Sequence, residues 1–160
     1  MKKKVLFVCL GNICRSPLAE ALFTKHVLVS GLENEFQIDS CGTANYHVGQ
    51  NPDARSYQNA LENGLRIEHR GRQLTYDDLI EYDYLLAMDK SNLANIKKLS
   101  KGAEPEGQIM MMREFDQEAN HQTDVPDPYY GGDNGFQEVF DILERSTEEL
   151  LSHLQKRHKI

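Results

Sequence analysis

The stretch "VLFVCLGNICRSPLAE", residues 5–20, contains the features that determine the fold. Its first four residues are continuously apolar, as expected for a central parallel strand that is covered on both faces. Gly11 and Asn12 form a turn, and Ser16 and Pro17 have the pattern of a helix start, with Ser16 as N-cap and Pro17 at the first helical position. This order of strand, loop and helix predicts the first unit of an α/β fold.

The rest of the chain continues to alternate between strand and helix patterns. We expect further strands from residue 36 into "SCGT", at "YDYLLAM" and at "QIMMM". We expect helices from Ser16 to a stop at Gly31, over residues 53–63, after a Thr75–Asp78 capping box, at "DKSNLANIKKL" and from near Phe136. Such alternation predicts an open parallel sheet with right-handed crossovers. Ligands of these sheets bind at the carboxyl ends of the strands, where the loop after residue 8 lies.

The composition indicates an ordinary globular protein with a negative charge. The chain has 160 residues, of which 39% are hydrophobic and 27% charged, enough for one domain with a full core. Its formal net charge is −7. This balance argues against a general nucleic-acid binder, which needs a broad basic face. Any anion that the protein binds must therefore meet a local cluster of hydrogen-bond donors.

Cysteine usage and the N-terminal stretch indicate a reducing compartment. Three cysteines are a low, odd number, unlike the even sets of disulfide-rich secreted domains. The start "MKKKVLFVCLGN" is basic, but its apolar run ends after six residues at Leu10, which is too short for a signal peptide. No segment approaches the length of a membrane span. We therefore expect a cytoplasmic protein without membrane insertion.

The loop after the first strand has the composition of an anion site next to a sulfur. Backbone N–H groups at a helix N-terminus attract anions, Gly11 permits a tight turn, and Arg15 offers a planar fork for two phosphate oxygens. Neither a Gly-Lys-Ser/Thr motif nor a GxGxxG follows the strand, so a nucleotide loop is not indicated. We expect the thiol of Cys9 to ionise near or below neutral pH in this field and its thiolate to act as a nucleophile. Ser16 is expected to donate to the sulfur and Asn12 to hold the loop. The alternative is that Cys9 is a buried apolar residue.

Attack of a thiolate on a phosphate ester also needs a proton donor for the leaving group. Asp127 in "TDVPDPYYGGDNGF" lies between two prolines, which stiffen the approach, and before glycines that let a loop fold over a site. Tyr129 and Tyr130 are candidates for the wall of a pocket for an aromatic group. The alternative is an ordinary surface turn. Asp124 and Asp133 are expected to be surface residues.

Together, these two motifs resemble those of the low-molecular-weight protein tyrosine phosphatases. "CLGNICRSP" is similar to the signature of that family and "DPYYGG" to its acid loop, and "DSCGTANYHVGQNPDARS", "HRGRQL" and "LLAMDKSNL" extend the resemblance over essentially the whole chain. The resemblance implies one domain over residues 1–160, with an open four-stranded parallel sheet and helices on both faces. It implies a protein-tyrosine-phosphatase that hydrolyses phosphotyrosine in proteins, and aryl and acyl phosphates, without cofactor or metal. It also implies a monomer or weak dimer that binds no nucleic acid.

The resemblance also implies roles for single residues. Cys9 is the nucleophile that forms a phosphocysteine, Arg15 clamps the phosphate, and Asp127 is first the general acid and then the base for water. The remaining expected residues surround these three: the loop residues Leu10, Gly11, Asn12, Ile13, Cys14 and Ser16, the supporting residues Ser40, His69 and Asp89, and the pocket wall of Tyr46, Tyr129 and Tyr130.

Several of these residues also have simpler explanations. Without the resemblance, His69 is a packed or surface histidine and Asp89 a helix N-cap. Cys14 matches a second loop cysteine that can bond reversibly to the nucleophile, or else is a buried thiol. Cys41 stands where many relatives have alanine, and we interpret it as a small buried residue.

Three other activities remain as alternatives. Arsenate reductases of this fold need a cysteine pair in the middle of the chain, but residues 82–100 contain no cysteine. Phosphoarginine phosphatases carry threonine where this loop has Ile13, whose apolar wall suits a phenyl ring better. A non-catalytic phosphopeptide-binding module would not need Cys9, Arg15 and Asp127 together. The three cysteines and six histidines show no spacing typical of a zinc site.

Overall fold

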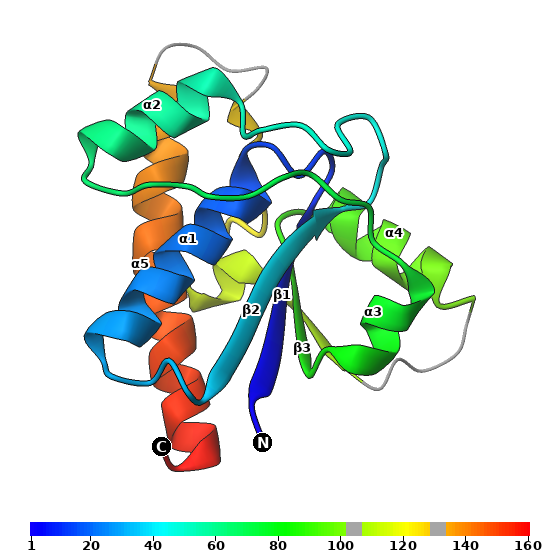
Figure 1. The fold of residues 1–160 in the computed structure, drawn as a ribbon, viewed down its shortest axis with the longest axis vertical. Coiled ribbons are helices and arrows are strands. Elements are labelled where there is room, and N and C mark those ends of the chain that lie inside the picture. The colour runs from blue at the N-terminus through cyan, green and yellow to red at the C-terminus, as the bar shows by residue number, and fades with distance from the viewer. Residues whose placement is uncertain (102–106, 129–133) are drawn as a thin grey trace.

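Four parallel strands form one open sheet in the computed structural model, which describes residues 1–101, 107–128 and 134–160. The strands follow the order β2-β1-β3-β4 (Figure 1). Their bounds are Lys3–Cys9 for β1, Phe36–Gly42 for β2, Tyr84–Ala87 for β3 and Gln108–Met111 for β4. The predicted four-stranded parallel sheet is confirmed.

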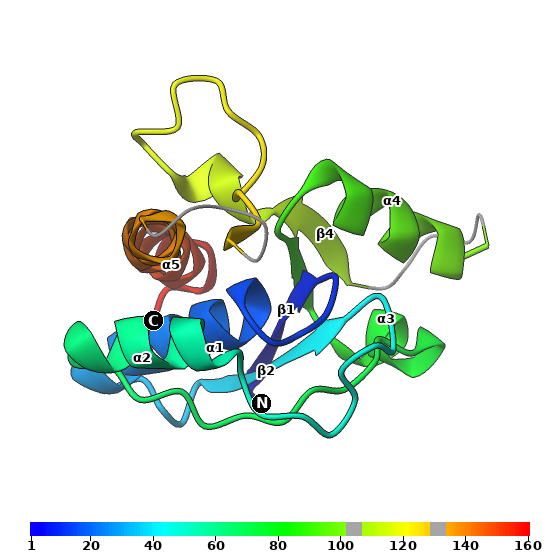
Figure 2. The same ribbon diagram turned by 90° about the horizontal axis from the view of Figure 1, so that it is seen from above.

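Helices cover both faces of the sheet, as predicted. Helices α1, α2 and α5 lie on one face, and α3 and α4 lie on the other (Figure 2). Their bounds are Arg15–Val29 for α1, Ala54–Glu62 for α2, Tyr76–Glu81 for α3, Lys90–Leu99 for α4 and Gly135–His158 for α5; a short 3-10 helix, η1, spans Met112–Phe115.

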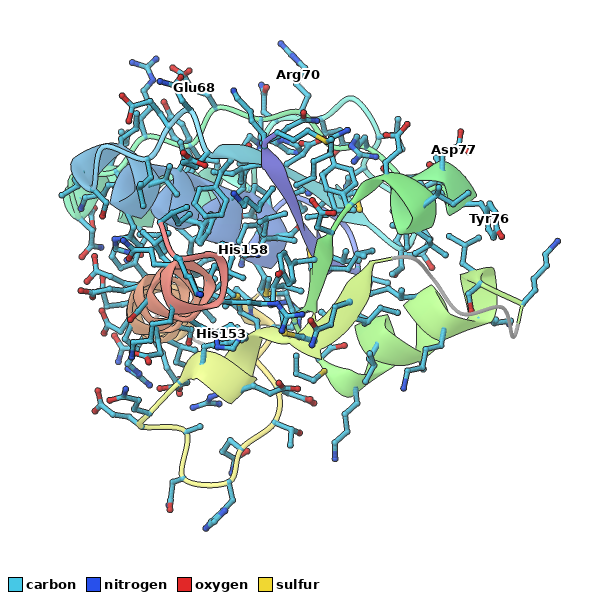
Figure 3. The ribbon with its side chains drawn as sticks, turned by 90° about the horizontal axis from the view of Figure 1, so that it is seen from below. Glu68, Arg70, Tyr76, Asp77, His153 and His158 are labelled. Carbon is cyan, nitrogen blue, oxygen red and sulfur yellow. The ribbon has the colours of Figure 1, made fainter. Side chains whose placement is uncertain are left out.

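The buried strand β1 divides the core into two layers. Val5 and Phe7 pack toward α1 and α5, and Leu6 and Val8 pack toward α3 and α4. All four side chains are fully buried, which explains why this strand shows a continuous apolar run instead of an alternating pattern. Helix α5 closes the first layer along its whole length, and Figure 3 shows His153 and His158 on it. His158 reaches the hydroxyl of Tyr84 on β3, at 2.7 Å.

The start of α1 differs from the prediction. The N-cap is Cys14 and the helix begins at Arg15, so Ser16 and Pro17 lie within the first turn. The Ser16 hydroxyl is 2.9 Å from the Cys9 sulfur instead of capping the helix. The predicted N-cap at Ser16 is therefore wrong, because the Ser16 hydroxyl contacts Cys9 at the end of β1.

The other helix starts agree with their local signals. Asp53 caps α2 by accepting from the N–H groups of Arg55 and Ser56. Asp78 accepts from the Thr75 N–H at 2.8 Å, which is the acidic half of the predicted capping box. Asp89 caps α4 through the Asn92 N–H, at 2.7 Å. None of the helices in the described part of the chain combines the length and apolarity that a membrane crossing would require.

Candidate active site

The loop that follows β1, called here the Cys9 loop (residues 9–16), is held by backbone contacts on both sides. The Thr43 N–H donates to the Cys9 carbonyl at 2.9 Å and the Asp53 N–H to the Ile13 carbonyl at 2.8 Å. A Cβ atom added to Gly42, at the end of β2, would lie 2.6 Å from the Leu10 carbonyl oxygen. Strand β2 therefore touches the Cys9 loop backbone to backbone, and only glycine fits there.

Asn12 is the centre of the Cys9 loop. Its φ of 58° lies in the left-handed region, which asparagine adopts more readily than most residues. Its backbone N–H donates to the Cys9 sulfur at 3.3 Å, and its side-chain amide donates to the hydroxyls of Ser16 at 2.8 Å and Ser40 at 3.0 Å. Both the sulfur and the loop shape therefore depend on this one residue.

The amide oxygen of Asn12 is held from the opposite side. It accepts from the backbone N–H of Arg72 at 3.0 Å and lies 2.7 Å from His69 Nε2. Because a backbone N–H can only donate, the orientation of the Asn12 amide is fixed and His69 Nε2 is the donor. The structure thus places the expected residues Ser40 and His69 directly against Asn12, partly or fully buried.

Sequence reasoning missed the charged residues behind this network. Glu20 accepts from the Ser40 hydroxyl at 2.7 Å and lies 3.1 Å from His69 Nδ1. Glu20 stands one helical turn after Ser16, and that spacing on one helix face was the available signal. Arg72 contacts Asp39 and Asp78. Burial alone would lower the pKa of Arg72, but these carboxylates raise it above its usual value.

Glu20, Asp39 and His69 also form a group that offers three ligand atoms within 4.8 Å of one another. Both carboxylates already have partners, since Glu20 accepts from Ser40 and Asp39 pairs with Arg72 at 2.9 Å. The group acts in this structure as support for the Cys9 loop.

Arg15 is almost fully buried, with 3% exposure, and its guanidinium is oriented by two acceptors. Its Nη1 donates to Asp89 Oδ2 at 2.7 Å and to the Val125 carbonyl at 3.0 Å. Its Nη2 lies 3.6 Å from Asp127 Oδ2, and Nε has no hydrogen bond to any residue that the structure describes. The Nε–Nη2 edge, which Asp127 approaches only through Nη2, is the edge that can bind two oxygens of one anion.

Asp89 has both of the functions that were considered for it. One carboxylate oxygen caps α4 and the other binds Arg15. Burial alone would lower the pKa of Arg15, but Cys9, Asp89 and Asp127 raise it above its usual value. The guanidinium consequently stays charged.

A cavity of about 280 Å³ opens over Cys9 and Arg15. Its lining residues come from the Cys9 loop, the segment after β2 and the loop that carries Asp127: Cys9, Leu10, Gly11, Ile13, Cys14, Arg15, Tyr46, His47 and Asp127. Tyr46 is 68% exposed, and His47 was not expected from the sequence. Tyr129 and Tyr130, the other expected wall residues, lie outside the described residues.

The segment of residues 116–128, called here the Asp127 loop, brings the carboxyl group to this cavity. The Val125 N–H donates to the Met88 carbonyl at 2.7 Å, just beyond the end of β3. The Asp127 side chain is 29% exposed. The arrangement places a sulfur, an anion-binding guanidinium and a carboxyl group around one cavity, which is the set needed for transfer of a phosphoryl group to sulfur.

Asp124, which was expected at the surface, is partly exposed and has defined partners. Its Oδ1 accepts from the Lys90 N–H at 3.0 Å, and its carbonyl accepts from Arg113 at 2.9 Å. The contact with Lys90 was not expected, because its partner is the first turn of a helix that lies far away in the sequence. Asp133, the second residue of this prediction, lies outside the described residues.

The two remaining cysteines are buried free thiols. Burial raises the pKa of Cys14, and Asp53 and the neighbouring Cys9 raise it further. Burial likewise raises the pKa of Cys41, which is fully inaccessible, as expected for a small buried residue.

Comparisons with known proteins agree with this geometry. A sequence model described as low molecular weight phosphotyrosine protein phosphatase matches residues 4–160. The chain is 45% identical to the low molecular weight phosphotyrosine protein phosphatase of Schizosaccharomyces pombe, over 94% of this chain and 96% of that protein.

Solved structures are also similar over nearly the whole chain. The protein tyrosine phosphatase of Entamoeba histolytica, crystallised with Hepes in its active site, superposes with a TM-score of 0.92 at 38% identity, covering 98% of this chain and 99% of that one. The Drosophila arginine phosphatase superposes with a TM-score of 0.87 at 33% identity, covering 97% and 98% of the two chains.

Proposed function

The chain belongs to the low molecular weight phosphotyrosine protein phosphatase family, a family of enzymes, and we propose that it hydrolyses phosphotyrosine in proteins through a phosphocysteine on Cys9. The observation that carries this proposal is that the Arg15 guanidinium, fixed by Asp89 and Val125, lies in the same cavity as the Cys9 sulfur and Asp127. The family comparison alone would not assign the reacting atoms.

In the first step, the phosphate of the substrate binds to the backbone N–H groups of the Cys9 loop and to Arg15. The Ser16 hydroxyl and the Asn12 N–H both face the sulfur, which reacts as the thiolate. The thiolate attacks phosphorus, so a P–S bond forms and the P–O bond to the ester oxygen breaks. Asp127 donates its proton to the leaving oxygen, which departs as a neutral phenol.

In the second step, the carboxylate of Asp127 removes a proton from a water molecule. The water oxygen attacks phosphorus, the P–S bond breaks and Cys9 leaves as a thiolate, which releases inorganic phosphate. Arg15 stabilises the charge on the phosphoryl oxygens in both steps, because its guanidinium is fixed by Asp89 before the substrate arrives.

The walls of the cavity support an aromatic leaving group. Ile13 is apolar and only 8% exposed, and Tyr46 presents a ring at the rim of the cavity. These side chains fit a phenyl ring better than a charged guanidino group. Phosphoarginine is the second candidate, because the similar Drosophila structure is an arginine phosphatase. The partner in either case is a phosphorylated protein or peptide, and the reaction needs no cofactor.

The test compares initial rates on phosphotyrosine, phosphoserine and phosphoarginine peptides, and on arsenate with a thiol reductant. Phosphotyrosine should be turned over fastest, in the presence of a metal chelator. Cys9→Ser should abolish turnover while it still binds vanadate, and acid quenching of the wild type should leave one phosphoryl group on Cys9. A faster rate on phosphoarginine would replace the substrate assignment, and a Cys9→Ser variant with wild-type turnover would remove the mechanism.

A further inference from the structure

Asp124 connects the Asp127 loop to the first turn of α4. Its Oδ1 accepts from the backbone N–H of Lys90 at 3.0 Å and from the Thr123 hydroxyl at 3.2 Å. Lys90 is the first residue of α4, and its N–H is one of the groups that have no partner within the helix. A carboxylate at this position also interacts favourably with the positive end of the helix dipole. Asp124 therefore has a defined binding partner and is not a freely solvated side chain.

The same helix end also positions Arg15. Asp89, the N-cap, binds the Asn92 N–H with one oxygen and Arg15 with the other. Asp124 and Asp89 thus use two different N–H groups of one helical turn. One rigid element is in contact with both the phosphate-binding arginine and the Asp127 loop.

The chain between Asp124 and Asp127 is restricted, so a shift of Asp124 should also move Asp127. Val125 is fully buried, donates to the Met88 carbonyl and accepts from Arg15. Pro126 and Pro128 fix their own φ angles and restrict the residues before them, so Asp127 has little freedom to adjust if the segment shifts.

We propose that Asp124 is a positioning residue for Asp127, which holds the Asp127 loop on α4 so that the carboxyl group reaches the leaving oxygen. The proposal rests on the proposed function, in which Asp127 is the general acid. Asp124 itself touches neither substrate nor sulfur. Its loss should therefore affect proton donation, while phosphate binding by the Cys9 loop continues.

The first experiment measures phosphoenzyme formation, in single turnovers, for aryl phosphates of increasing leaving-group pKa. Because a misplacement of about 1 Å can cost up to about 10²-fold in rate, we expect Asp124→Ala to lose about tenfold with phenyl phosphate. The same variant should stay within about twofold of wild type with a dinitrophenyl ester, whose phenol leaves without a proton. Asp124→Asn keeps the accepting oxygen and should retain most of the wild-type dependence. Inorganic phosphate should inhibit all variants equally.

The second experiment removes the donor instead of the acceptor. Lys90→Pro deletes the N–H at the first helical position, where proline is tolerated, and Asp89 before it is already extended, with φ −148° and ψ 173°. This variant should reproduce the steeper leaving-group dependence of Asp124→Ala, and the double variant should add little to either single change. Lys90→Ala keeps the N–H and is the matched control. Asp77→Ala, at an exposed position of α3 (Figure 3), controls for the loss of an acidic side chain.

Asp127→Ala, measured in parallel, tests the proposed function separately from the positioning role of Asp124. If Asp127→Ala steepens the dependence but Asp124→Ala and Lys90→Pro keep the wild-type slope, the positioning role of Asp124 is wrong and the proposed function stands. If Asp127→Ala itself has the wild-type slope, both are wrong. Urea unfolding of each variant identifies any change that merely reflects loss of folded protein.

Discussion

The Cys9 loop and the Asp127 loop meet at one cavity but are held in different ways. The Cys9 loop surrounds a buried polar network centred on Asn12, and Cys9 and Arg15 are each 3% exposed. The Asp127 loop contacts the chain between β3 and the first turn of α4 through Asp124 and Val125, which bind Lys90 and Met88. The carboxyl group of Asp127 is 29% exposed. The difference teaches that the Asn12 network supports anion binding alone, although both loops also depend on the first turn of α4, through Asp89 and Asp124. Substitutions should therefore be able to impair anion binding and proton donation independently.

The largest effect that sharpens this comparison is expected for Arg15→Lys. Lysine keeps the charge but loses the fork and the paired contacts to Asp89 and Val125. Loss of one donor aimed at transition-state charge costs about 2.7–4 kcal/mol, so kcat/KM should fall by about 10²–10³. The loss should be equal for good and poor leaving groups. A loss confined to poor leaving groups would show that Arg15 belongs functionally to the Asp127 loop.

Substitution of Asn12 tests the network itself. Asn12→Ala leaves buried partners unpaired and keeps a Cβ at a φ of 58°, which alanine tolerates less well than asparagine, whereas Asn12→Gly loses the same hydrogen bonds without the backbone strain. Because a small displacement of the loop costs up to about 10²-fold, we expect a loss of about 10–100-fold with either variant on every substrate. Kinetics on phenyl and dinitrophenyl phosphate measure this. Recovery of activity in Asn12→Gly alone would show that backbone strain matters and the network does not.

Asp116 extends the comparison to the base of the Asp127 loop. Its buried carboxylate accepts from Arg145 at 2.6 Å and from Arg113 at 3.0 Å, and Arg113 also donates to the Asp124 carbonyl. Burial alone would raise the pKa of Asp116, but the contacts with Arg145, the Glu118 N–H and Arg113 hold it below its ordinary value of 3.8.

A carboxyl group whose pKa is lowered by folding stabilises the folded state above its unfolded pKa. This contribution disappears as the pH falls through the pKa of the group in the folded state. Asp116→Asn should therefore lower the free energy of unfolding at pH 7 by about 1.5–3 kcal/mol, and less at pH 3, as measured by urea unfolding. Asp141→Asn, on the exposed side of α5, is the control. An equal loss at both pH values would contradict the assigned ionisation.

The smallest effect on rate is expected for Cys14. Because burial and Asp53 raise its pKa, Cys14 remains a thiol at neutral pH, and Cys14→Ser should keep turnover within about twofold. Iodoacetate should modify Cys9 alone, as shown by peptide mapping. After mild peroxide, the wild type should form a Cys9–Cys14 disulfide that thiols reverse, whereas Cys14→Ser should lose activity irreversibly. Alkylation of Cys14 at the rate of Cys9 would contradict the difference between the two thiols.

The sequence predicts what depends on neighbours along the chain and misses what depends on distant partners. The apolar run from Val5 to Val8 is sufficient to identify the central strand, and Asp89 is recognisable as a helix cap from its local pattern. That its second oxygen binds Arg15 is a contact between different elements. The contact of Asp124 with the N–H of Lys90 was missed for the same reason.

The Cys9 loop illustrates the same limit within a motif. Its composition indicated an anion site, but a hydroxyl, an amide and a thiol permit many mutual arrangements. The Ser16 hydroxyl was assigned both to a helix cap and to the Cys9 sulfur, and of the two the structure contains only the contact with Cys9. Glu20 and Arg72 became visible only when the fold placed them behind Asn12.

The close contact of Gly42 with the Cys9 loop has a calorimetric consequence. Because the strand end leaves no room behind the Leu10 carbonyl, the loop is already ordered before any anion arrives. The conformational entropy of arranging its N–H groups is lost during folding, so binding of an oxyanion should carry only a small entropic penalty from the protein. Little apolar surface is buried when so small a polar ligand enters. Vanadate binding should therefore show a heat-capacity change close to zero.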